Sequence, residues 1–164
     1  MVRKVAIEAD REKVIRVSVG TGKYSVRGIG IPIDGNGLVV CILGGEVPHV
    51  GAVALSIPRP GLRHTEGISA TSSVLTLVGH MEDEIAKPAS WKIAKELNKV
   101  TVVIAGIHIE SDPPYHATES ELKQLAASTK EVTDKLIAEF KQQLVAAQET
   151  EGNREPQEQT PRQA

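Results

Sequence analysis

The chain of 164 residues carries 19 basic and 21 acidic side chains, which leaves a formal net charge of −2 at pH 7. This length suits one domain with a hydrophobic core and is short for two. A nearly neutral chain has no overall field that attracts nucleic acid or an anionic membrane surface, and one tryptophan, two tyrosines and one phenylalanine are too few for a base-stacking platform. DNA and RNA are therefore excluded as expected partners.

Cysteine content and hydropathy indicate the compartment. The only cysteine, Cys41, lies in an apolar run, so no internal disulfide can form and a reducing environment is expected. No segment approaches the ~20 consecutive apolar residues that a membrane span requires, and the N-terminal residues lack the apolar core of a signal peptide. These observations predict a cytoplasmic protein without membrane contact.

The first half of the chain is rich in β-branched residues, in short runs that glycine interrupts, and this pattern predicts strands. Segments 20–23 and 34–37 indicate hairpin turns, because tight turns need residues that accept positive φ. The opening strands are therefore expected to form an antiparallel meander. The predicted strands span residues 3–9, 14–19, 24–31, 38–43, 50–57 and 72–78.

The second half changes to helical periodicity. Apolar residues from 82 to 97 follow three and four spacing, and Pro88 indicates either a helix that starts near Lys87 or one that starts at Glu82 and bends. Residues 100–109 form a continuous apolar run typical of a central strand. A last helix is expected over residues 119–147, because its apolar residues repeat at helical spacing and Thr118 with Glu121 resembles a capping box.

These elements predict an α+β fold: a mostly antiparallel sheet of about six to seven strands with two helices packed on it, in the order β-meander and then β-α-β-α. A single domain is expected to cover residues 1–148. Residues 149–164 contain no apolar residue able to anchor them except Ala164, so we expect a disordered C-terminal tail.

The ends of strands are where sheets commonly carry binding or catalytic side chains. Three histidines lie at the ends of predicted strands: His49, His80 and His108. Nothing in the sequence places these ends beside one another. A histidine between two isoleucines, as at His108, is also typical of a satisfied core residue. A site shared by the three histidines is therefore a hypothesis.

His80 is followed by three carboxylates in the next turn. Acidic residues at the start of a helix complement its dipole and need no further function. From His80 to Glu84 is one helical turn if the helix already includes His80, and that spacing suits metal ligation or a carboxylate that orients an imidazole. Both interpretations of the segment stay open.

Arg59 stands between Pro58 and Pro60, which restrict the backbone on both sides of it. A guanidinium aimed in this way suits recognition of phosphate or carboxylate, and the alternative is an exposed arginine in a stiff loop. The glycine-rich segment 20–24 lacks the pattern of a phosphate-binding loop. No Gly-x-Ser-x-Gly motif is present, so covalent catalysis is not expected.

Three segments, residues 48–60, 72–99 and 100–111, together resemble the family of LpdD-like prenylated flavin chaperones. The resemblance implies a fold similar to that of small proteasome assembly chaperones. It also implies an accessory protein that helps a UbiD-type decarboxylase acquire mature prenylated FMN, by binding this cofactor and assisting its oxidation. The motif positions of the family map onto His49, Gly51, Arg59, Gly79, His80, Asp83, Glu84 and His108.

The resemblance also implies ligands and partners. A flavin phosphate requires an arginine, a lysine or a helix N-terminus, which Arg59, Lys87 and the turn after His80 can supply. The glycine-bearing face of the sheet can supply an apolar slot for the flavin ring. The expected partners are the UbiD-type decarboxylase, a UbiX-type flavin prenyltransferase and further copies of the chain, in a homodimer or higher homo-oligomer. The expected cofactor-binding residues are His49, Gly51, Arg59, Gly79, His80, Lys87 and His108.

Three classes of function stay open. The first is the cofactor chaperone. The second is a metal-dependent enzyme, in which histidines and a carboxylate hold a divalent ion that activates water or an electron transfer. The third is a protein-assembly chaperone without a cofactor. The sequence leaves open whether any chemistry occurs on this chain. The metal ligands expected for the second class are His49, His80, Glu84 and His108.

Overall fold

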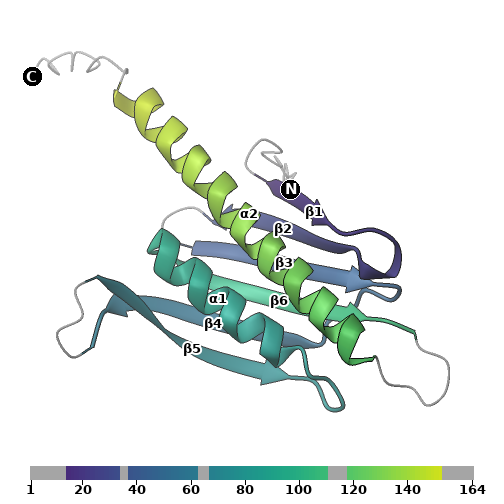
Figure 1. The fold of residues 1–164 in the computed structure, drawn as a ribbon. Helices are drawn as coiled ribbons and strands as arrows, with labels where there is room; N and C mark the ends of the chain where they lie inside the picture. Colours follow the sequence, from purple (N-terminus) through teal and green to yellow (C-terminus); the bar gives the residue numbers. More distant parts are fainter. Residues whose placement is uncertain (1–13, 34–36, 63–66, 111–117, 153–164) are drawn as a thin grey trace, which may run out of the picture.

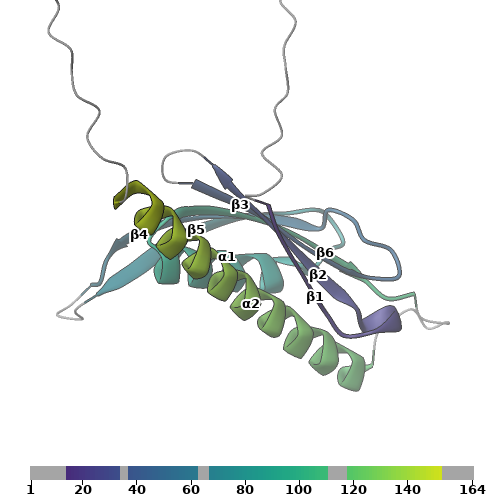
Figure 2. The same cartoon turned by 90° about the horizontal axis from the view of Figure 1, so that it is seen from above.

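The computed structural model describes residues 14–33, 37–62, 67–110 and 118–152 (Figure 1). In this part of the chain six strands form a single sheet, and helices α1 (Asp83–Leu97) and α2 (Glu119–Gly152) both lie on the same side of it (Figure 2). The predicted α+β fold is therefore confirmed. The strands are β1 (Ile15–Val19), β2 (Val26–Ile33), β3 (Gly37–Gly45), β4 (Ala52–Pro60), β5 (Ile68–Thr76) and β6 (Val100–His108), and a 3-10 turn, η1 (Gly22–Tyr24), joins β1 to β2.

The strands pair in the order β1-β2-β3-β6-β4-β5. Strands β1 to β3 form the predicted antiparallel meander, and β4 pairs with β5 in the same sense. Strand β6 lies between β3 and β4, parallel to β3 and antiparallel to β4, which confirms that residues 100–108 form a central strand. The predicted strand at residues 3–9 and the turn residues 34–36 lie outside the described residues.

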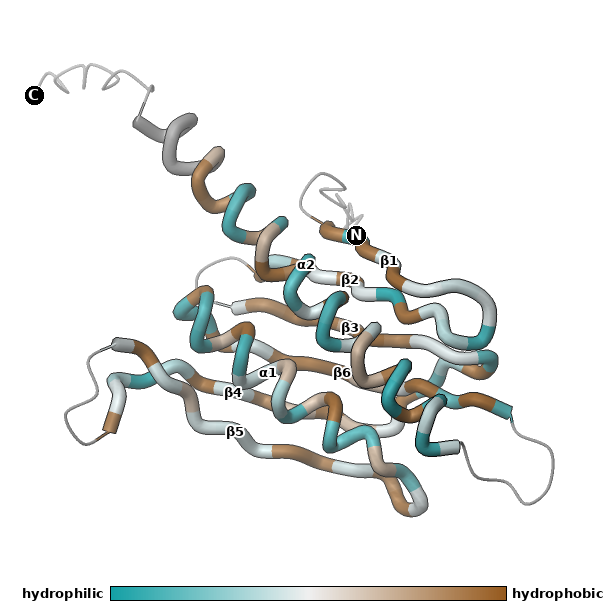
Figure 3. The backbone as a smooth tube through the Cα atoms, viewed as in Figure 1, coloured by the Kyte–Doolittle hydropathy of each residue, from teal (hydrophilic) through white to brown (hydrophobic). Residues whose placement is uncertain are grey.

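The helix-covered face of the sheet holds the hydrophobic core. Figure 3 shows apolar residues concentrated along β3 and β6 in the middle of the sheet. Helix α2 packs so closely on β2 that a Cβ atom at Gly28 would lie 2.6 Å from Val132, and one at Gly30 would lie 2.5 Å from Phe140. Because these glycines have no side chain, α2 can pack directly against β2. The apolar slot that the sequence predicted on this face for a flavin ring is therefore filled by side chains of α2.

The open face of the sheet carries the alternate side chains of each strand, and no described helix lies on it (Figure 2). Several of these side chains are large, apolar and solvent-exposed. Cys41 is half-buried on this face, and burial raises the pKa of its thiol. The exposed apolar residues of the open face are Ile31, Ile33, Leu55, Ile57 and Leu75.

Helix α1 begins at Asp83, and Pro88 lies inside it, so the alternative in which the helix starts near Lys87 is wrong. Proline lacks an N–H group, and the helix accepts it at the expense of one intrahelical hydrogen bond to Glu84.

Helix α2 begins with the predicted capping box. The Thr118 N–H donates to a Glu121 carboxylate oxygen at 2.8 Å, and the Glu121 N–H donates back to the Thr118 hydroxyl at 3.3 Å. The helix continues to Gly152, beyond the end expected near residue 147.

Candidate metal and cofactor site at one end of the sheet

The pairing of β6 between β3 and β4 brings three strand-end segments to one end of the sheet. Because β3 and β6 are parallel, both finish there, while β4 begins there and β5 finishes there (Figure 1). His49 lies in the connection from β3 to β4, His80 in the connection from β5 to α1, and His108 is the last residue of β6. The three histidines that the sequence placed at strand ends are thus neighbours.

His49 lies between the other two histidines. Its ring centroid is 4.7 Å from that of His80, and its Nε2 atom is 3.0 Å from His80 Nδ1. The His108 ring is 6.0 Å from the His49 ring, edge to face at 78°. His49 and His80 are partly buried, and His108 is exposed, so solvent reaches this end of the sheet.

The backbone around His49 rests directly on β6. A Cβ atom at Gly106 would lie 1.8 Å from the His49 carbonyl oxygen, so only glycine allows this close approach. The His49 side chain is oriented by a 3.0 Å hydrogen bond between Nδ1 and the Val47 carbonyl oxygen. A carbonyl only accepts, so Nδ1 carries a proton and donates it, which turns Nε2 toward His80.

Glu82 joins the histidines. Its side chain is 8% exposed, with Oε1 3.0 Å from His49 Nε2 and Oε2 3.4 Å from His80 Nδ1. Oε2 also accepts the Met81 N–H at 3.1 Å. A Cβ atom at Gly51 would lie 2.4 Å from the Glu82 carboxyl carbon, so glycine leaves the room that this carboxylate occupies. His49, His80 and Glu82 are called the imidazole–carboxylate cluster below.

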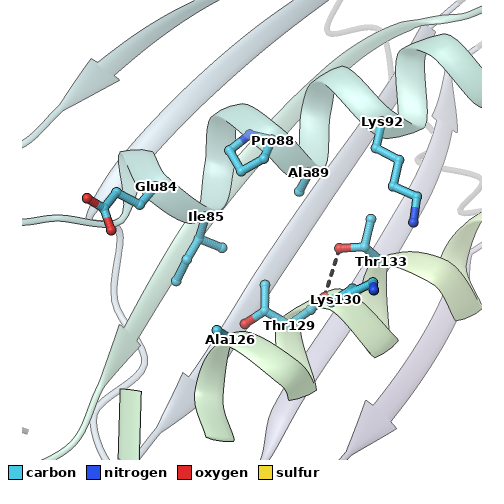
Figure 4. A pocket seen from close by; sticks show the side chains of 9 residues that line it. All are labelled: Glu84, Ile85, Pro88, Ala89, Lys92, Ala126, Thr129, Lys130 and Thr133. Carbon is cyan, nitrogen blue, oxygen red and sulfur yellow. Dashed lines mark hydrogen bonds between the residues drawn. The ribbon is translucent and has the colours of Figure 1, made fainter. Parts of the chain in front are cut away.

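Glu84, the carboxylate proposed from the sequence, lies elsewhere. The helix begins only at Asp83, so His80 precedes it and the one-turn spacing from His80 to Glu84 does not apply. Glu84 lines a groove of about 180 Å³ between α1 and α2 (Figure 4), which is smaller than the ~300–1,000 Å³ typical of sites for ligands of drug size. The groove is lined by Glu84, Ile85, Pro88, Ala89, Lys92, Ala126, Thr129, Lys130 and Thr133.

Arg59 lies at the opposite end of β4 from His49. The strand rises about 23 Å from Ala52 to Arg59, at about 3.3 Å per residue. The guanidinium donates to the Thr71 hydroxyl and to the Pro60 carbonyl, both at 2.9 Å. The cofactor-binding residues expected from the sequence therefore do not form one site, because Arg59 lies far from the histidines.

The charged residues near the three histidines determine which ligands this end of the sheet can bind. Glu82, Asp83 and Glu84 lie at the start of α1, and Lys87 follows about one turn later. Carboxylates at a helix N-terminus occupy the place that an anion would otherwise take. The imidazoles and the exposed turn at Gly79 fit an uncharged ring or a cation, and the start of α1 does not fit the phosphate of a flavin mononucleotide.

The similarity to known proteins extends over most of the chain. A model of the family described as prenylated flavin chaperone LpdD-like domain matches residues 20–141. No curated protein matches the chain significantly. Among solved structures, a chain from the crystal structure of a novel chaperone complex for yeast 20S proteasome assembly is 15% identical, with a TM-score of 0.49, over 80% of this chain and 97% of that one. At this identity and score the likeness says nothing of what the chain binds.

The described part of the chain contains two α-helices, α1 and α2. Neither is both long enough and apolar enough to cross a bilayer.

Proposed function

The chain belongs to the family of LpdD-like prenylated flavin chaperones, and on this basis we propose that it is an accessory protein that helps a UbiD-type decarboxylase acquire mature prenylated FMN. The observation that carries the proposal is the family match over residues 20–141, a range that includes β2 to β6 and α1. The resemblance in the segments around the three histidines supports the same function.

The proposed contact with the cofactor is at the histidine end of the sheet. The exposed turn at Gly79 has a φ of 83°, and a Cβ atom there would meet nothing within 4 Å, so space is open beside it. His49, His80 and His108 surround the same end with imidazole groups. In this proposal the flavin ring contacts these groups, and the phosphate stays with the decarboxylase, because the carboxylates at the start of α1 disfavour an anion.

The open face of the sheet supports a role in binding protein. Large apolar residues exposed together on one face mark interaction surfaces. Leu55, Ile57 and Leu75 are 39%, 52% and 78% exposed on neighbouring strands β4 and β5. We assign this face to self-association in a homodimer, which leaves the histidine end for the decarboxylase and for the UbiX-type prenyltransferase that makes the cofactor.

The experiment measures decarboxylase maturation. A UbiD-type decarboxylase is produced in cells with a flavin prenyltransferase, with or without this chain, and its activity and prenylated FMN content are determined. We expect the chain to raise both, and His80→Ala to remove most of the gain. Arg59→Ala is the matched control and should retain it, because Arg59 lies far along β4 from the histidines. Equal maturation with and without the chain would refute the proposal.

A metal-dependent enzyme is the second candidate function. One observation favours it: two imidazole nitrogens and a carboxylate converge in the imidazole–carboxylate cluster. Such a function also requires a substrate beside the ion, so the first question is whether the cluster binds a metal.

A further inference from the structure

We propose that His49, His80 and Glu82 form a binding site for one divalent transition-metal ion. The inference goes beyond the proposed function and does not depend on it, because it rests on the geometry of these three side chains. Their ligand atoms, one from each residue, all lie within 4.8 Å of one another.

The separations between the ligand atoms match those around a small ion. A tetrahedral ion with ligands at ~2.0–2.1 Å holds those ligands about 3.3 Å from each other. In the cluster, His49 Nε2 lies 3.0 Å from both His80 Nδ1 and Glu82 Oε1, and His80 Nδ1 lies 3.4 Å from Glu82 Oε2. These separations involve different oxygens of Glu82, so a rotation of the carboxylate, or binding through both of its oxygens, brings the three groups around one ion.

A metal ion can be shared by all three side chains of the cluster, whereas one proton joins two of them. With Nδ1 of His49 donating to Val47, the Nε2 atom of the neutral ring carries a lone pair that faces the Glu82 carboxylate. A single proton bridges only one pair of these atoms, His49 Nε2 with His80 Nδ1 or His49 Nε2 with Glu82 Oε1. A divalent cation accepts electron pairs from all three groups at once.

The burial of Glu82 adds to this argument. A buried carboxylate is costly unless a positive charge or hydrogen bonds offset the loss of water. In the described part of the chain its basic partners are the two histidines, which are not permanently charged. A bound divalent ion would supply the missing positive charge.

The surroundings orient the ligands in the manner typical of metal sites, where a histidine commonly donates its second N–H to a carbonyl or a carboxylate. Val47 has this role for His49, and the Met81 N–H holds one oxygen of Glu82. Gly106 and Gly51 leave space for the His49 backbone and the Glu82 carboxylate, respectively. The ligands are thus positioned before any ion arrives.

The ligand set indicates the class of metal. Two imidazoles and one carboxylate suit Zn²⁺, and the same set on one face of an ion suits Fe²⁺. His108 lies beside the cluster, with its ring 6.0 Å from that of His49. The three protein ligands leave the remaining coordination positions of the ion to water or to an oxygen donor from another molecule.

The experiment uses the full chain purified without a histidine tag and freed of metal. Zn²⁺, and Fe²⁺ under anaerobic conditions, are titrated separately, with bound metal measured by elemental analysis and affinity by calorimetry. We expect about one equivalent of at least one ion, and at least a tenfold weaker affinity in Glu82→Gln and in His49→Gln. Binding to the folded state should also raise the melting temperature of the wild type and not that of the variants.

Glu84→Gln is the matched control, because it removes a neighbouring carboxylate on the first turn of α1 that lies outside the cluster. Its affinity should stay within about twofold of the wild type. Circular dichroism verifies that each variant is folded. No binding of either ion by the wild type, or an equal loss in Glu84→Gln and Glu82→Gln, would overturn the proposal. Decarboxylase maturation is measured separately, so either proposal can fail without the other.

Discussion

The two faces of the sheet differ in what covers them, although the same alternating strands build both. On the helix-covered face, α2 packs on Gly28 and Gly30, and Phe140 is 3% exposed. On the open face, Leu55 and Leu75 are 39% and 78% exposed. The first face therefore carries the packing that stabilises the monomer, and the second leaves large apolar side chains exposed to solvent.

The largest effect is expected from Phe140→Ala on the helix-covered face. Truncating a buried phenylalanine removes its packing and leaves a cavity, so the free energy of unfolding should fall by about 3–5 kcal/mol. Urea denaturation followed by circular dichroism measures this change.

Gly30→Ala is the control for the position of Phe140. A Cβ atom at Gly30 would lie 2.5 Å from the Phe140 ring, so the single change should destabilise the wild type by about 1–3 kcal/mol. In the Phe140→Ala background the same change should cost much less, because the ring is gone. Equal costs in the two backgrounds would show that α2 does not pack on β2 in this register.

A smaller loss of stability is expected from changes at the N-terminus of α2. Thr118 lies immediately before the helix, and its side chain accepts the Glu121 N–H. Thr118→Ala should lower the free energy of unfolding by about 1 kcal/mol at neutral pH. Thr118→Ser is the control and should keep most of the stability, because serine retains the hydroxyl.

The same helix start predicts a pH dependence. A hydrogen bond from Lys23, and then those from Thr118, lower the pKa of Glu121 from 4.5 to about 2. The folded pKa lies below the unfolded one, so the ionised carboxylate stabilises the fold above pH 4.5, and this contribution is lost as the pH falls toward about 2. Urea denaturation across this window should show a smaller loss in Glu121→Gln than in the wild type. Equal losses would contradict the role of Glu121.

The smallest effect on monomer stability is expected on the open face. Leu55→Ser should change the free energy of unfolding of the isolated chain by no more than about 0.5 kcal/mol. It should nevertheless weaken self-association, which light scattering after size-exclusion chromatography detects as a lower mass at equal concentration. Ser73→Ala changes the cross-strand neighbour of Leu55 and is the matched control. A wild-type chain that is monomeric at every concentration would contradict the assignment of this face.

Much of the fold could be predicted because its signals are local. Strand alternation, the turn at residues 20–23 and the Thr118–Glu121 capping box each depend on a few neighbouring residues. The insertion of β6 between β3 and β4 depends on pairing between distant segments, which periodicity does not specify. This pairing is also what makes His49 and His108 neighbours, so their proximity was a hypothesis from the sequence and a finding of the structure.

The carboxylate of the cluster could not be chosen from spacing alone. The choice of Glu84 was conditional on a helix that already includes His80, whereas the helix begins at Asp83 and the buried carboxylate is that of Glu82, the residue just before it. The room for Glu82 comes from Gly51, on a different segment, and nothing in the sequence connects the two. The separation of Arg59 from the histidines, in contrast, could have been predicted, because a strand between them must hold them far apart.

The place of β6 in the sheet also determines when the sheet can be completed during synthesis. All three residues of the imidazole–carboxylate cluster are translated before β6, yet the His49 backbone rests on Gly106 of that strand. Until β6 emerges from the ribosome, the β1–β3 meander and the β4–β5 hairpin lack their common neighbour, and the parallel pairing with β3 must form across a long stretch of chain. The full sheet, and the contact of His49 with Gly106, can therefore form only after β6 has been translated.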